Sequence, residues 1–347
     1  MNISILSGIL LIALGAFSSG SFAVPFGKIK YWNWETYWMI FSIGAYIIFP
    51  LTACIIFAPS FGSIISSTAG KTIFTVFALG MVYGIGNLSF GLALRYLGLS
   101  LGYALSLGLM LAIGTLIPPI IDGRLEVMMQ KSGGMMLIFG IIIACVGIAL
   151  SAWAGILKDK HVSDARKQES IGEFNLVKGL VASVLVGITG SAMSLGFEQG
   201  IPISEMAANQ GVDPLFTMMP VVLVLFSGTM ITTIGWCFYL GYKNKSFKNY
   251  VIKNTNNVLT YNYLYGLLAG FLWFAQFIAY GMGKSKMGQF TFTSWGILMA
   301  LTIVFAAVWG VIRKEWKGAP IRVLILMALS LIIIIVSSFI IGISGSE

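Results

Sequence analysis

The sequence has little charge, one histidine and three cysteines in a chain of 347 residues. Charged residues make up 10% of the chain and hydrophobic residues 58%, whereas about 25% of the residues in a typical soluble domain are charged. The mean hydropathy is +0.92. A soluble fold with this composition would leave large apolar areas facing water. The composition therefore argues against a soluble enzyme and for a protein whose surface faces lipid.

These shortages also exclude several kinds of site. The single histidine, His161, lies in a charged stretch, so neither a histidine-based zinc site nor a histidine-based triad can be built. Cys54, Cys145 and Cys237 lie singly inside apolar runs, and such a set predicts no disulfide framework and no metal cluster. The 21 Lys and Arg outnumber the 12 Asp and Glu, but the cations lie between apolar runs and form no single patch. We therefore expect no metal, no cofactor and no nucleic-acid partner.

Long apolar runs are what the sequence does contain. They cover residues 3–24, 36–58, 72–94, 99–121, 134–154, 176–198, 215–240, 260–283, 287–312 and 322–343. A membrane-spanning helix needs about 20 predominantly apolar residues, so we predict an all-α polytopic membrane protein with ten transmembrane helices. No Lys or Arg precedes the first run, which favours a spanning helix over a cleaved signal peptide.

The distribution of Lys and Arg predicts the orientation. The odd-numbered connections between runs hold 16 of these residues, when Lys178 and Arg322 at the ends of the adjoining runs are included, and the even-numbered connections hold 5. Cytoplasmic loops of membrane proteins carry the excess of positive charge. The odd connections are therefore expected in the cytoplasm, and both termini on the outer side.

A long polar stretch that begins at Lys158 divides the chain into two sets of five runs. It predicts a first repeat over 1–157, a cytoplasmic linker over 158–175 and a second repeat over 176–347. Asn87 is followed eight residues later by Arg95, and Gln276 eight residues later by Lys284. Because five spans per half invert the second copy, we predict two inverted five-helix repeats with the substrate held between them, as in secondary carriers.

Two acidic residues are not easily placed in loops. Glu35 opens the second run and Glu198 ends the sixth. Ionisable groups at membrane depth are costly and are functional candidates by default, and a carboxyl in a poorly hydrated site can bind a proton near neutral pH. Both are therefore candidates for proton coupling. Alternatively, Glu35 stabilises a helix N-terminus and Glu198 is a solvated helix end. The aromatic residues around Glu35, from Tyr31 to Trp38, are expected to form an interfacial belt.

Uncharged polar and aromatic residues inside the runs predict the kind of cargo. Asn87 and Gln276 each offer amide donors and acceptors. Trp273 and Tyr280 share a helix face with Gln276, and Trp295 follows a group of hydroxyl residues. Amides and flat aromatic faces suit a neutral polyhydroxylated ligand, and no Lys or Arg inside the membrane is available for a phosphate or carboxylate. The alternatives are interior packing of the tryptophans and helix–helix hydrogen bonding by the amides.

Several segments, in order along nearly the whole chain, resemble the L-rhamnose–proton symporter family of the drug/metabolite transporter superfamily. They are Pro25-Phe26, Trp32-Asn33-Trp34-Glu35-Thr36, Gly84-Ile85-Gly86-Asn87, Arg95-Tyr96-Leu97-Gly98-Leu99-Ser100, Glu173-Phe174-Asn175, Gly211-Val212-Asp213-Pro214-Leu215, the positions Trp273, Gln276-Phe277 and Tyr280, and Lys314-Glu315-Trp316. The resemblance implies ten helices in two inverted repeats, a bacterial inner-membrane location and proton-driven uptake of L-rhamnose or a similar deoxy sugar such as L-lyxose. It favours Glu35 over Glu198 as proton carrier, because Glu35 lies in a shared motif whereas the family more typically has an amide at the position of Glu198.

We therefore predict a transporter, not an enzyme, that takes up a neutral monosaccharide with a proton by alternating access. One alternative is a drug/metabolite-type exporter of a small amphipathic metabolite. Another is a membrane-embedded enzyme or sensory scaffold, for which the sequence offers no catalytic constellation. Sodium would use much the same oxygen ligands as a proton-coupled site, so the sequence leaves the coupling ion open, together with the sugar and the oligomeric state.

Overall fold

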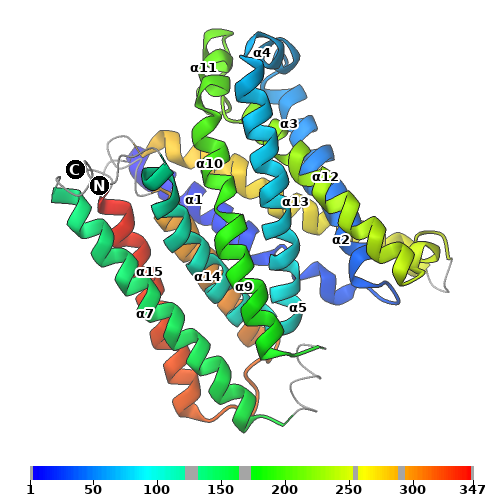
Figure 1. The fold of residues 1–347 in the computed structure, drawn as a ribbon, viewed down its shortest axis with the longest axis vertical. Coiled ribbons are helices and arrows are strands. Elements are labelled where there is room, and N and C mark those ends of the chain that lie inside the picture. The colour runs from blue at the N-terminus through cyan, green and yellow to red at the C-terminus, as the bar shows by residue number, and fades with distance from the viewer. Residues whose placement is uncertain (1–2, 122–131, 164–172, 253–256, 288–293, 345–347) are drawn as a thin grey trace. The chain divides into compact units, whose positions relative to one another are not determined.

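The computed structural model is built from helices joined by loops (Figure 1). It describes residues 3–121, 132–163, 173–252, 257–287 and 294–344, and none of these residues is in a β-strand. In chain order, the helices are α1 (Ile3–Ser21), η1 (Pro25–Lys28), α2 (Trp34–Ile43), η2 (Gly44–Ile48), α3 (Phe49–Phe57), α4 (Phe61–Ser67), α5 (Gly70–Ile121), α7 (Ser132–His161), α9 (Leu176–Gly190), α10 (Ala192–Gln199), α11 (Ile201–Asn209), α12 (Met219–Lys243), η3 (Ser246–Tyr250), α13 (Val258–Lys286), α14 (Ser294–Ile312) and α15 (Ile321–Ser344).

Eight helical stretches among the described residues are long and apolar enough to cross a membrane. They are Ile5–Lys28, Trp34–Phe57, Gly70–Ile113, Gly134–His161, Leu176–Asn209, Met219–Lys243, Val258–Lys286 and Ile321–Ile341. This finding confirms the prediction of an all-helical polytopic membrane protein. The stretches expected at 72–94 and 99–121 both lie in α5, and the run expected at 287–312 contains a shorter apolar helical stretch, Ile297–Ile312.

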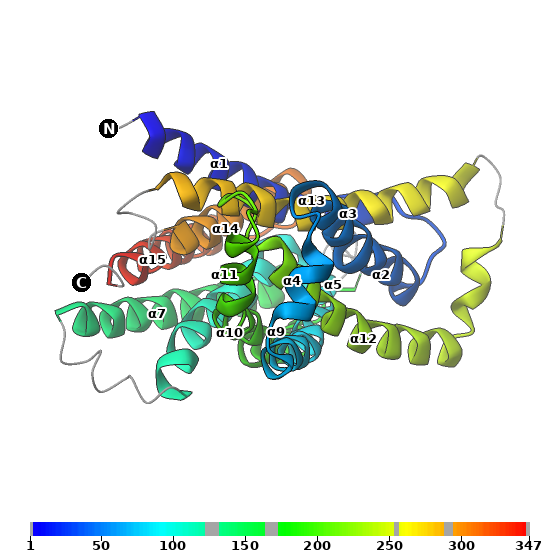
Figure 2. The same ribbon diagram turned by 90° about the horizontal axis from the view of Figure 1, so that it is seen from above.

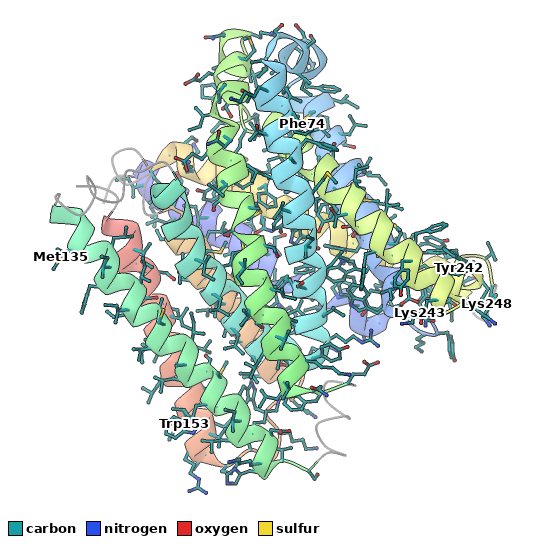
Figure 3. All side chains as sticks on the ribbon, viewed as in Figure 1. Phe74, Met135, Trp153, Tyr242, Lys243 and Lys248 are labelled. Carbon is teal, nitrogen blue, oxygen red and sulfur yellow. The ribbon has the colours of Figure 1, made fainter. Side chains whose placement is uncertain are left out.

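Large apolar side chains project outward from these helices. Phe74 on α5 is 71% exposed, and Met135 and Trp153 on α7 are 68% and 53% exposed (Figure 3). Soluble monomers rarely expose contiguous apolar surfaces of this kind, whereas a lipid-facing surface requires them. The exposed residues therefore agree with the low charge of the sequence.

The long helix α5 is interrupted at Gly98. The φ angle of this residue is +80°, a conformation that glycine adopts readily because it has no Cβ. The N–H groups of Leu99 and Ser100 that follow the break donate hydrogen bonds to the Glu315 carboxylate, at 2.8 and 3.1 Å. A loop residue more than 200 positions away in the sequence thus caps the second segment of α5.

The chain forms two compact units, each of which takes segments from both halves of the sequence. Unit 1 comprises Met1–Gly20, Gly86–Ser191 and Gly283–Glu347, and unit 2 comprises Ser21–Ile85 and Ala192–Met282. Three of the boundaries fall inside helices, before the last residue of α1, in α5 and in α13. The predicted repeats, 1–157 and 176–347, are therefore halves of the sequence that each contribute to both units.

In unit 1, α7 and α15 run side by side (Figures 1 and 2). Gly140 and Gly147 on α7 face α15 so closely that an added Cβ would press on isoleucine side chains there. One turn further on, the Ser151 hydroxyl donates to the Ser330 hydroxyl at 2.8 Å. Small residues and hydroxyl pairs are what hold helices together in lipid, where no hydrophobic force drives their association.

In unit 2, two close helix crossings are each made by a pair of glycines. Gly80 on α5 meets α12 at Gly228, and the Thr229 hydroxyl reinforces this contact by donating to the Gly80 carbonyl at 3.0 Å. Gly270 on α13 meets α2 at the start of η2, next to Gly44. A side chain at either crossing would hold the two backbones apart, so glycine is required by the close approach.

The expected linker over 158–175 begins inside a helix, because α7 continues to His161. Lys158 is 1% exposed, and Lys160 and His161 follow it in the last turn. Positive charge is favourable at a helix C-terminus, which explains why the helix extends beyond the apolar run that ends at 154. Residues 164–172 of the expected linker lie outside the described residues.

We predict that Glu315→Ala destabilises the protein, because the Leu99 and Ser100 N–H groups lose their acceptors in a buried place. An unsatisfied buried donor costs about 1–3 kcal/mol. The thermal unfolding midpoint of the purified protein in detergent should therefore fall, with a smaller fall for Glu315→Gln, which keeps one acceptor oxygen. Glu205→Ala, at an exposed position on α11, is the matched control. Equal midpoints for Glu315→Ala and Glu205→Ala would contradict the capping role of Glu315.

Candidate functional site

The carboxyl group of Glu35 is buried at the first turn of α2 in unit 2. Glu35 is 3% exposed, and its Oε1 accepts hydrogen bonds from the Ser246 hydroxyl at 2.7 Å and from Asn244 Nδ2 at 3.0 Å. Both donors come from the turn that follows α12, where Lys245 has a left-handed backbone with φ of +52°. Sequence reasoning identified Glu35 but missed Asn244 and Ser246.

The residues beside Glu35 are joined to the same turn. Asn249 Nδ2 donates to Asn33 Oδ1 at 2.9 Å and to the Thr36 hydroxyl at 3.3 Å. Burial, followed by the charges of Cys237, Tyr263 and Glu35, raises the pKa of the neighbouring Tyr250. The Tyr250 phenol therefore stays neutral at physiological pH, and Glu35 is the acidic group of this cluster.

The aromatic residues around Glu35 are largely interior, in contrast to the expected interfacial belt. Trp34 and Trp38 are 4% and 1% exposed, and their rings stack with centroids 5.1 Å apart. Tyr31, in contrast, lies on the surface and is 76% exposed. The belt interpretation is therefore wrong for Trp34 and Trp38, because these rings pack on one another and on neighbouring helices.

Three of the predicted binding residues lie on one face of α13. Their spacing of three and four residues places them on the same side of the helix. All three are buried, with Trp273, Gln276 and Tyr280 exposed by 4%, 5% and 6%. Gln276 Nε2 donates to the Trp273 carbonyl at 2.8 Å. This bond fixes the direction of the amide, which has a second N–H and a carbonyl oxygen for further hydrogen bonds.

A cluster of aromatic rings encloses Trp273. The ring centroids of Tyr46, Phe226 and Phe277 lie 5.1, 5.0 and 5.1 Å from that of Trp273. These distances are typical of edge-to-face and tilted aromatic pairs, which stabilise a packed interior. The structure thus surrounds the predicted sugar-stacking indole with ring faces from α12, α13 and η2.

Asn87 belongs to unit 1, and it is 1% exposed on α5. Two glycines precede it on α5, Gly84 and Gly86. Gly86 lies against the backbone of Gly190 in unit 1, and Gly84 lies against Thr229 and Thr232 in unit 2. Both glycines therefore serve close packing of helices.

The structure gives less detail for the other two predicted site residues, Glu198 and Trp295. Glu198 is half-buried near the end of α10. Trp295 lies in the first turn of α14, and its side chain is outside the described residues. Over the part of the chain that the structure describes, no group of three His, Cys, Asp or Glu residues is arranged to hold a metal ion.

Three motifs from distant parts of the sequence meet in unit 1. Arg95 pairs with Glu173 through two hydrogen bonds, and Asn175 N–H donates to the Tyr96 carbonyl at 3.1 Å. Lys158 Nζ lies 4.8 Å from the ring centroid of Trp316 and 5.1 Å from that of Phe174. Together with the Glu315 cap, these contacts join the segments 95–100, 173–175 and 314–316. Sequence reasoning listed these segments without relating them.

Comparison with known proteins places these features in a family. A family model described as L-rhamnose-proton symport protein (RhaT) matches residues 1–346. The L-rhamnose-proton symporters of Escherichia coli (strain 55989 / EAEC) and Shigella dysenteriae serotype 1 (strain Sd197) are each 34% identical over 345 residues, which is 99% of this chain and 99% of each relative. No solved structure gives a match. The chain therefore belongs to the L-rhamnose-proton symport protein family, a family of membrane transporters and not of enzymes.

Proposed function

We propose that this chain takes up L-rhamnose or a closely related neutral deoxy sugar together with a proton, by alternating access across the bacterial inner membrane. The observation that carries the proposal is the match to relatives named L-rhamnose-proton symporter over 99% of both chains. The buried carboxyl of Glu35 and the amide and aromatic face of α13 supply the two kinds of group that such a carrier needs.

The proposal includes ten spanning helices arranged as two inverted five-helix repeats. Three observations support it. The break at Gly98 divides α5 into two segments, which brings the helical stretches closer to the expected ten. A shift of 189 residues, the distance from Asn87 to Gln276, moves Ser21–Ile85 onto 210–274, within the other segment of unit 2. The two glycine crossings of unit 2 pair α5 with α12 and α13 with α2, as two inverted copies would.

We further propose that both termini face the periplasm. The support is the excess of Lys and Arg in the odd-numbered connections and at the ends of the adjoining runs, 16 against 5 in the even-numbered connections. A reporter enzyme that is active only outside the cytoplasm, fused after Glu347, tests this orientation.

In the proposed site, Asn87, Gln276, Trp273, Tyr280 and Trp295 bind the sugar. Amide groups bind hydroxyls, and the indole rings pack on the apolar face of the sugar. The enclosure of Trp273 by three rings requires that this cluster opens during the transport cycle. Burial of the amides excludes water, which strengthens each hydrogen bond to the sugar.

For proton coupling we propose Glu35, with Glu198 as the alternative carboxyl. Glu35 is the more deeply buried of the two. The hydroxyl of Ser246 and the amide of Asn244 donate hydrogen bonds to its Oε1. Protonation would weaken these two bonds and release the turn after α12, which links the proton to a change of structure.

The first test is uptake by proteoliposomes that contain the purified protein. Labelled L-rhamnose should accumulate when the outside is more acidic than the inside, and a sodium gradient should have no effect. Unlabelled L-rhamnose and L-lyxose should compete, whereas D-glucose should not. No stimulation by the pH gradient would overturn proton symport, and no competition by L-rhamnose would overturn the substrate.

The second test separates the two carboxyls. Glu35→Gln should abolish accumulation driven by a pH gradient, because the amide cannot carry a proton. It should retain exchange of labelled for unlabelled sugar, because exchange needs no net proton movement. Glu198→Gln is the comparison and should accumulate sugar normally. Loss of pH-driven accumulation in Glu198→Gln alone would transfer the role to Glu198.

The third test concerns the sugar site. Gln276→Ala should raise the half-saturation concentration for uptake by about fivefold, since a lost hydrogen bond to a ligand is worth about 1 kcal/mol and each 1.4 kcal/mol is tenfold. The variant should remain inserted in the membrane at normal levels. Gln199→Ala, at an exposed position of α10, is the matched control. Normal uptake by Gln276→Ala would remove Gln276 from the site.

A further inference from the structure

Unit 1 contains a cavity at the connection between α14 and α15. Its volume is about 440 Å³, within the range of roughly 300–1,000 Å³ that is usual for ligand sites. Most of its wall is aliphatic, and the remaining lining residues are basic, aromatic or hydroxyl-bearing. The lining residues are Ser100, Ala307, Val311, Lys314, Trp316, Lys317, Leu324, Met327, Ala328 and Leu331.

The polar side of this cavity is positively charged. Lys314 and Lys317 are exposed, and the Lys317 N–H donates to the Lys314 carbonyl at 3.0 Å, so that the two lysines stand at the ends of one turn. Glu315 lies between them, but its carboxylate is buried and bound to the Leu99 and Ser100 N–H groups. Glu315 is not among the lining residues, so the two lysines are the charged side chains of the cavity wall.

The cavity also holds a buried hydroxyl group with no hydrogen bond. Ser100 is 2% exposed, and its Oγ has no partner in the structure. The hydroxyl occupies space against Gly310 that any side chain there would fill. A buried polar group without a partner is destabilising, so a ligand oxygen within reach of the Ser100 hydroxyl would be favourable here.

We propose that the cavity binds one anionic phospholipid. The acyl chain lies along the aliphatic wall formed by α14 and α15, the phosphate faces Lys314 and Lys317, and the Ser100 hydroxyl donates to an oxygen of the glycerol esters. Basic pockets between membrane helices are typical sites for anionic lipid headgroups. A neutral sugar would gain little from an aliphatic wall and two lysines, so this site is distinct from the proposed transport site and does not rest on it.

The proposed lipid adjoins the break in α5. Ser100 belongs to the same capped turn as Leu99, and Trp316 follows Glu315 in the capping loop. A phospholipid in the cavity would therefore hold α14, α15 and the second segment of α5 together. Its binding is expected to stabilise the folded protein, because a ligand that binds only the folded state raises the free energy of unfolding.

The experiment measures lipid retention by the full-length protein, purified in detergent, with native mass spectrometry. The probes are phosphatidylglycerol, phosphatidylcholine of the same chain length and inorganic phosphate. Phosphatidylglycerol should be retained in a ratio of one per chain and should raise the thermal unfolding midpoint, whereas the other two probes should do neither. Equal retention of phosphatidylcholine would overturn the anionic preference. Stabilisation by phosphate alone would overturn the lipid assignment.

Variants locate the site. Lys314→Gln with Lys317→Gln should weaken phosphatidylglycerol binding about thirtyfold, at about 1 kcal/mol for each lysine near an anionic lipid surface. Ser100→Ala should weaken it to a smaller extent, and Ala328→Trp should abolish it by filling the cavity. The control pair is Lys243→Gln with Lys248→Gln. It changes two exposed lysines, one at the C-terminal end of α12 and one on η3 (Figure 3). It should leave binding unchanged.

The variants are compared in phosphatidylcholine, where all of them should unfold at nearly the wild-type temperature if they are folded. A loss of phosphatidylglycerol binding confined to the cavity variants would support the site. Undiminished binding by a folded Ala328→Trp protein, or an equal loss in the Lys243 and Lys248 control, would overturn it.

Discussion

The Glu315 carboxylate holds together the part of unit 1 where the longest helix is broken. A helix break leaves backbone N–H groups without partners, and such groups cost several kcal/mol each where water is absent. The pairing of Glu315 with the Leu99 and Ser100 N–H groups meets this requirement. It also fixes the loop between α14 and α15, and with it Trp316 against the buried Lys158. Gly98, Glu315 and Lys158 therefore form one interdependent arrangement, in which the change of chain direction depends on a distant carboxylate.

Glu35 is the corresponding feature of unit 2. Here a carboxyl at a helix start is bound by donors from a distant turn, Ser246 and Asn244, whereas Glu315 lies in a loop and binds donors at a helix start. The two carboxyls differ in their partners, because Glu315 binds backbone N–H groups whereas Glu35 binds side chains. Loss of a backbone hydrogen bond disturbs a helix, while loss of a side-chain bond releases only a turn. This difference suits Glu315 to a fixed structural role, and it agrees with the proton-coupling role that we propose for Glu35.

The helices could be predicted from the sequence, and candidate site residues could be chosen from it, but the residues that contact them could not. A lipid environment makes the helix the only way to satisfy the backbone of a long apolar run, so the runs mark the helices closely. Glu35 was recognisable because a carboxyl next to an apolar run is unusual. Asn244 and Ser246 were not, because they lie about 210 residues away in a turn that otherwise resembles any basic loop. The interior position of Trp34 and Trp38 depends on packing between helices, which the pattern of residues along one helix does not contain.

The boundaries of the two compact units have a consequence for which residues the chain accepts there. The chain passes from one unit to the other after Gly20, before Gly86, after Ser191 and before Gly283, and Gly190 precedes Ser191. At Gly20, Gly86 and Gly283, an added Cβ would press on neighbouring atoms of unit 1 at less than 3.0 Å. At these three junctions the chain therefore leaves unit 1 at a residue without a side chain, and even alanine there would force the packed helices of unit 1 to shift.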